Sequence, residues 1–256
     1  MRNKILFLSF LFSLIFNLSL FAEEFEINSS KIKYDDKNKI TVFEDNVTLN
    51  DKIGNKLFSE YIKYNKSAEL IETIGETKII TSGGYEVLSS NVILNNKKNT
   101  IYSNDKTNII DKDGNKIFVE MFNYSISNNI FFSKGKIKIK DINNNDYNFS
   151  EIYIDENKSK IIGSDIKAFL NQSNLTNNVD NDPRFFANTF SLSDNTSTFE
   201  KGIFTYCKNR GDDKCPPWVL QSKKIKHDLS TKTIYYDNAI LKVYDFPIFY
   251  FPKFSH

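Results

Sequence analysis

The segment Asn46–Asn65 reads NVTLNDKIGNKLFSEYIKYN, and its pattern returns along the chain every 30 residues without an insertion. A repeat at a fixed period of this length is typical of proteins built from stacked structural units. Five columns of mostly apolar and β-branched residues keep the same frame: Ile32, Ile62, Val92, Phe122 and Ile152; Tyr34, Tyr64, Leu94, Tyr124 and Ile154; Thr41, Ile71, Ile101, Phe131 and Ile161; Val47, Thr77, Thr107 and Ile137; and Leu49, Ile79, Ile109 and Ile139.

The repeat has the spacing of β-strands joined by turns. Ile62 and Tyr64 are two residues apart, which places both side chains on one face of a strand. Between the columns lies the turn Asp51-Lys52-Ile53-Gly54, which recurs at 81–84, 111–114 and 141–144. In such a turn Asp accepts hydrogen bonds from its own backbone and Gly adopts positive φ. A unit therefore fits about three strands of five to seven residues, and about five units stack into an elongated all-β body.

Two folds satisfy this pattern: a closed β-solenoid, and an open-sided V-shaped β-jellyroll with a groove between its two sheets. The apolar columns line the interior of either fold. They either pack only against each other or leave a groove that takes up acyl chains, in which each buried methylene contributes about 0.8 kcal/mol. The candidate groove residues are Ile32, Tyr34, Val47, Leu49, Ile62, Tyr64, Ile79, Val92, Leu94, Ile109, Phe122, Tyr124, Ile139, Ile152 and Ile154.

The composition argues against an enzyme. The chain has 256 residues, 40% of them hydrophobic, so it can form a core. Its 34 basic and 32 acidic residues exclude a strongly basic nucleic-acid binder. Two His and two Cys leave little material for a metal centre, and no phosphate-loop, dinucleotide or zinc motif is present. We therefore expect no catalytic residues, no metal and no cofactor; a carbohydrate-active solenoid would need clustered exposed acids that the columns lack.

The first residues have the pattern of a secretory signal. Arg2 and Lys4 precede an apolar run of about a dozen residues, shorter than the roughly 20 that span a bilayer. We expect cleavage after Ala22, with an uncleaved anchor as the alternative, and export to an oxidising compartment. Removal of the segment leaves 32 basic against 32 acidic residues.

The periodicity fades after Leu170. Residues 171–183 are polar and Asn-rich, which predicts a linker between a repeat domain at 23–170 and a connecting segment at 184–256. Cys207 and Cys215 enclose seven residues in a chain that we expect to be exported, so a disulfide is expected, although spacing does not give its connectivity. Pro247 and Pro252 each remove a donor from the last aromatic run, which shapes a loop or protects a strand edge.

Three features together resemble the LptD family of lipopolysaccharide-assembly outer-membrane proteins, also called organic solvent tolerance protein OstA. The first is a signal segment followed by repeats of the type Asn46–Leu49, Gly54 and Phe58–Asn65. The second is Phe204–Cys207 leading to Trp218 and the strand Ile225–Asp228. The third is Phe246–Ser255, which reads FPIFYFPKFS and is similar to the family's segment leading into its membrane barrel.

The resemblance implies an OstA-like β-jellyroll that conducts lipopolysaccharide at the outer membrane without catalysis. It further implies a β-barrel after His256, so that the sequence is interpreted as part of a longer protein; the alternative is a free-standing relative of the bridge proteins LptA and LptC. Expected partners are an LptA-like bridge protein that pairs with free edge strands around Lys31–Tyr34, and an LptE-like lipoprotein at the barrel. The family also implies that Cys207 pairs with the barrel, and that Pro247 and Pro252 weaken pairing where the barrel wall opens. A filled structural β-solenoid, such as an adhesin, remains the rival from another class.

Overall fold

The computed structural model describes residues 25–170, 182–193, 195–207, 216–228, 230–231 and 233–255, without the side chains of Asp182 and Cys207. The predicted signal segment at 1–22, most of the predicted linker and Cys215 lie outside the described residues. The strands are β1 Phe25–Asn28, β2 Lys31–Asp35, β3 Ile40–Asp51, β4 Lys56–Asn65, β5 Leu70–Thr73, β6 Glu76–Ile80, β7 Glu86–Ser90, β8 Ile93–Asn95, β9 Thr100–Ser103, β10 Thr107–Ile110, β11 Lys116–Val119, β12 Phe122–Ser125, β13 Ile130–Lys140, β14 Asp146–Asp155, β15 Lys160–Phe169, β16 Asp182–Ser193, β17 Thr196–Cys207, β18 Trp218–Asp228, β19 Thr233–Val243 and β20 Phe246–Ser255.

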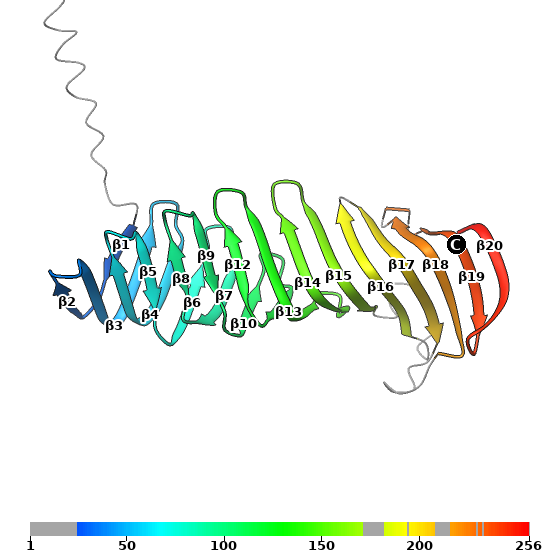
Figure 1. Cartoon of the computed structure of the whole chain (residues 1–256), viewed down its shortest axis with the longest axis horizontal. Helices are drawn as coiled ribbons and strands as arrows, with labels where there is room; N and C mark the ends of the chain where they lie inside the picture. The colour runs from blue at the N-terminus through cyan, green and yellow to red at the C-terminus, as the bar shows by residue number, and fades with distance from the viewer. Residues whose placement is uncertain are drawn as a thin grey trace, which may run out of the picture.

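All pairings between these strands are antiparallel, and together they form one elongated body with β1 and β2 at one end and β20 at the other (Figure 1). The prediction of an all-β protein of stacked 30-residue units is confirmed. No helix in the described residues has the length and apolar character needed to cross a membrane.

The sheet is folded lengthwise into two halves that face each other. Half A contains β2, β5, β8, β9 and β12, and half B contains β1, β6, β7, β10 and β11. The long strands β3, β4 and β13–β20 cross from one half to the other. Phe185 and Phe199 stack across the interior with ring centroids 4.8 Å apart, and Phe149 meets Phe190 at 5.7 Å. The apolar inner faces therefore bury each other, as in a β-jellyroll.

The two halves meet at a fold line. There each run of about ten strand residues, which we call an arm, bends in its middle. The ladder of β3 and β4 shifts register between Glu44 and Val47, and that of β13 and β14 between Lys134 and Ile137. Bends of this kind need backbone in the left-handed region, which Gly, Asn and Asp adopt most readily. The positive-φ residues along the fold line include Asp45, Asn46, Gly75, Asn91, Gly135 and Asp165.

The sequence-based estimate of three short strands per unit is therefore wrong. Each 30-residue unit is one hairpin with two arms of about ten residues, and the bend divides several arms into a strand in each half, such as β5 and β6. The mid-arm bend falls on a 30-residue column that contains only Asp and Gly, at Asp45, Gly75, Asp105, Gly135 and Asp165, which the apolar strand pattern does not include.

Two rows of hairpin turns form the edges of the two halves. In half A the turns carry positive φ at Lys39, Glu69, Asn99, Asn129 and Ser159, each 30 residues after the last. In half B the predicted Asp–Gly turn is confirmed: Asp51 Oδ1 accepts hydrogen bonds from the backbone of Ile53 and Asn55, and Gly54 has φ of 96°. Asn55 Oδ1 in turn accepts from the backbone of Ser82 at 2.8 Å, so that it joins one turn to the next.

Side-chain volumes compensate across the core near the fold line. Phe149 occupies the position that Ser59 and Ser89 hold in earlier units, and the strand beside it has Gly163 where earlier units have Thr73 and Ser103. A Cβ on Gly163 would lie 2.5 Å from the Phe149 ring. The larger side chain therefore requires glycine next to it.

We predict that Gly163→Ala lowers the free energy of unfolding by about 1–3 kcal/mol, the usual cost of overpacking a buried site. Chemical denaturation of the variant measures this loss. Gly83→Ala is the matched control, because the nearest atoms to its added Cβ lie 3.7 Å away in an exposed turn, and it should stay within about 0.5 kcal/mol of the parent. Equal stability of both variants would show that Phe149 does not need this glycine.

Candidate functional site

The candidate groove residues lie on the inner faces of the two halves, at different depths. Those beside the fold line are almost fully buried: Val47, Ile62, Val92, Phe122 and Ile152. Leu49, Ile79 and Ile109 in half B are also buried, at 5–8% exposure. These residues pack against each other as an ordinary core.

Residues nearer the turns are only partly buried. We call them the rim residues: Tyr64, Leu94, Ile101, Tyr124, Phe131, Ile154 and Ile161 in half A, and Val87, Ile117, Ile139 and Tyr147 in half B. They lie farther from the fold line, and each keeps part of its surface accessible. The column Leu57, Val87, Ile117 and Tyr147 was not identified from the sequence, although it has the same 30-residue spacing.

Ile32 and Tyr34 are exposed, at 62% and 60%. They belong to β2, the edge strand of half A, and among the described residues no strand lies beyond them. The column of Ile32 is buried, and that of Tyr34 partly buried, wherever a further unit stacks on it, so the exposure of Ile32 and Tyr34 marks the open end of the interior.

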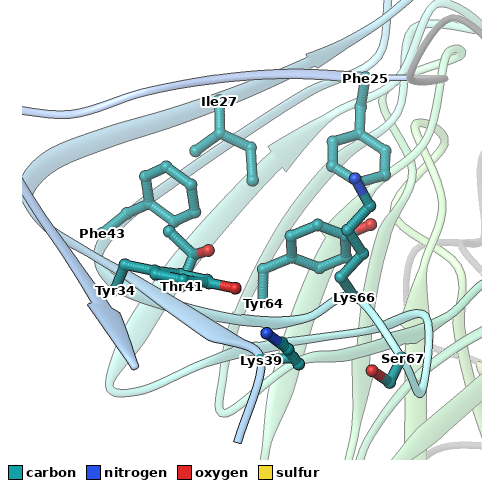
Figure 2. Close-up of a pocket in the computed structure, with 9 residues that line it drawn as sticks. All are labelled: Phe25, Ile27, Tyr34, Lys39, Thr41, Phe43, Tyr64, Lys66 and Ser67. Atoms are coloured by element: carbon teal, nitrogen blue, oxygen red, sulfur yellow. The ribbon is translucent and has the colours of Figure 1, made fainter. Parts of the chain in front are cut away.

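A pocket of about 620 Å³ occupies this open end. Figure 2 shows Phe25 and Ile27 of β1 reaching into it from half B, opposite Tyr34 and Tyr64 of half A. The Phe25 and Tyr64 rings meet edge-to-face at 5.4 Å, which links the halves at the end of the pocket. The remaining lining residues are Lys39, Thr41, Phe43, Lys66 and Ser67.

Two lysines give the pocket a cationic rim. Lys39 pairs with Asp36 at 2.6 Å on the exposed side of its turn. Lys66, in the next turn of the row, forms no ion pair among the described residues. Apolar walls with a cationic rim suit a ligand that has both a hydrocarbon part and an anionic group.

Phenols and carboxylates line the middle of the rim. Tyr124 Oη donates a hydrogen bond to Glu156 Oε2 at 2.9 Å, and burial together with that carboxylate raises the pKa of Tyr124. Burial also raises the pKa of Tyr85 in half B, to which the charges of Glu156 and Asp111 add. Tyr147 Oη lies 3.3 Å from Asp141 Oδ2, and burial, reinforced by this charge, raises its pKa. These phenols are neutral hydrogen-bond donors at neutral pH.

The described residues contain no group of three or more His, Cys, Asp and Glu side chains that could hold a metal ion. The side chain of Cys207 and the whole of Cys215 lie outside the described residues, so their pairing stays a prediction. Pro247 lies beside a register shift in the β19–β20 ladder. Pro252 is opposite the mid-arm bend at Asn238, which has positive φ. Both prolines therefore occupy places where a backbone donor is not needed.

We predict that the protein loses stability above pH 10. A phenol whose folded-state pKa is raised above the unfolded value of 10.0 contributes stability that is fully present below pH 10 and is lost as the pH rises further. The urea midpoint should therefore fall in this range, together with a rise in tyrosinate absorbance. The double variant Tyr124→Phe/Tyr147→Phe should show a shallower fall, and an unchanged slope would contradict the assignment.

Comparisons with known proteins add a likeness to solved structures. No family model matches the sequence, and no curated protein matches it. Among solved structures, the chain is similar to the crystal structure of LptH from Pseudomonas aeruginosa, described as the LptA homologous periplasmic component of the conserved lipopolysaccharide transport device. The match has 13% sequence identity and a TM-score of 0.24, and it covers 54% of this chain and 79% of that chain. The functional case for this chain therefore rests on its own sequence and geometry.

Proposed function

We propose that the protein is a non-enzymatic conduit that carries lipopolysaccharide toward the outer membrane, with the acyl chains held between the two half-sheets. The observation that carries this proposal is the run of partly buried apolar rim residues, which continues from the terminal pocket along the stacked units. The resemblance to LptD on Phe246–Ser255 and the repeats supports the same function.

The rim residues, rather than the buried columns beside the fold line, provide the path. Ile62 and Phe122 already fill the space around them, whereas Leu94 and Ile154 retain accessible surface. Equivalent rim residues are two strands apart, which is about 9–10 Å along the body. An acyl chain that leaves one site therefore meets a similar site within its own length.

The charged part of the lipid remains outside the half-sheets. At the terminal pocket, the cationic rim of Lys39 and Lys66 suits the phosphates of lipid A, while Phe25, Ile27 and Phe43 suit an acyl chain. Farther along, the Tyr124 and Tyr147 hydroxyls already donate to Glu156 and Asp141, so these phenols can only accept hydrogen bonds from sugar hydroxyls.

The proposal includes partners at the ends of the body. Among the described residues, β1 and β2 each pair on one side only, with β3. Their free edges suit the last strand of an LptA-like bridge protein by β-augmentation. An outer-membrane location and an LptE-like partner follow from the resemblance to LptD.

A photo-crosslinking experiment in cells tests the path. A benzophenone side chain at Leu94, Tyr124 or Ile154 should capture lipopolysaccharide. The matched controls are the preceding residues Ile93, Asn123 and Tyr153, whose side chains point to the opposite face of the same strands, and they should capture at least tenfold less.

Capture mainly from Ile93, Asn123 and Tyr153, or from none of the six positions, would contradict the conduit. The absence of capture at all six positions is the result expected for a purely structural β-solenoid whose rim stays closed.

A further inference from the structure

The outer face of half B carries a cluster of lysines over β11, β13 and β15. Lys116, Lys138, Lys140 and Lys167 are all exposed and alternate with the inward Ile117, Ile137, Ile139 and Ile166. Lys116 lies directly opposite Lys140 in the β11–β13 ladder. Like charges in that position repel each other, so the arrangement costs stability unless an anion is nearby.

Some lysines elsewhere on the outer surface pair with an acid on a neighbouring strand, such as Lys78 with Glu86 at 3.1 Å and Lys63 with Glu72 at 3.3 Å. Within the described part of the chain, none of the four clustered lysines forms an ion pair, although Asp146 is opposite Lys140 in the β13–β14 ladder. The repeat column that holds Ile80 and Ile110 in earlier units holds Lys140 here.

Aromatic side chains lie among these lysines on the same face. Phe118 is opposite Lys138, and Phe186 of β16 is opposite Lys167. Phe169 and Phe186 meet edge-to-face with centroids 6.1 Å apart. All three rings are partly exposed. We call these seven residues the basic–aromatic face.

We propose that the basic–aromatic face binds the surface of an anionic lipid bilayer. Lysines attract anionic head groups, and aromatic side chains prefer the boundary between head groups and acyl chains. The seven residues lie on the outer face of strands that pair in succession from β11 to β16, so they form one continuous patch. An acidic protein would satisfy the lysines but gives no reason for the partly exposed rings. This interaction is separate from the conduit, because its residues point away from the interior.

Vesicle co-sedimentation tests the proposal. The exported protein, purified after removal of its signal segment, should bind phosphatidylglycerol-containing vesicles at low salt, and binding should fall steeply with added salt. The variant K116Q/K138Q/K140Q should bind about a hundredfold more weakly, since each lysine near an anionic surface is worth roughly fivefold.

The matched control K33Q/K63Q/K160Q removes the same charge from the outer face of half A and should bind within about threefold of the parent, because those lysines face away from the bilayer. Phe118→Ala should weaken binding without changing its salt dependence. Equal binding by both triple variants, or binding to phosphatidylcholine vesicles as strong as to anionic ones, would overturn the proposal. So would anionic-vesicle binding too weak to detect at low salt.

Discussion

The structure depends on one constraint. Each arm, a run of about ten strand residues, bends in its middle, so that the two halves of its apolar face bury each other. An isolated sheet of this composition would leave one apolar face in water. The bend turns that face inward, and stacking extends the shared core from unit to unit. The residues with positive φ at the bend, such as Asp45 and Gly135, are therefore as important as the apolar columns.

Because of this bend, the interior is fully packed next to the fold line and only partly packed near the turns. Next to the bend the half-sheets are joined by covalent chain, and Val47, Ile62 and Ile152 have no accessible surface to offer. Buried hydroxyls satisfy the carbonyls that the bend removes from the ladder: Ser103 Oγ donates to Ser90 O at 2.6 Å and Ser133 Oγ to Met121 O at 2.8 Å. Toward the turns the halves are held by side-chain contacts, such as Phe25 with Tyr64, which can exchange for contacts with a lipid.

Much of this could be predicted from sequence because it repeats. The columns, the Asp51–Gly54 turn and the all-β architecture follow from 30-residue spacing. The bend has a sequence signal that the apolar columns do not include: Asp45, Gly75, Asp105, Gly135 and Asp165 recur every 30 residues and are of the types that adopt positive φ most readily. The depth of each column could not be predicted, since Ile62 and Leu94 are both apolar inward residues. Ile32 shares its column with the buried Ile62, and Tyr34 with the partly buried Tyr64, but both are exposed at an end of the body. Pairing between strands, rather than local sequence, decides these features, and it also explains why β16–β20 continue the sheet after the columns lose their frame.

The central claim is that acyl chains contact the rim residues between the half-sheets. Intermolecular nuclear Overhauser effects between lipid acyl protons and isoleucine methyl groups measure this contact directly. The account predicts effects at Ile101, Ile154 and Ile161 on the rim, and none at Ile142 in an exposed turn or Ile162 on the outer face. Effects confined to Ile142 and Ile162 would contradict it.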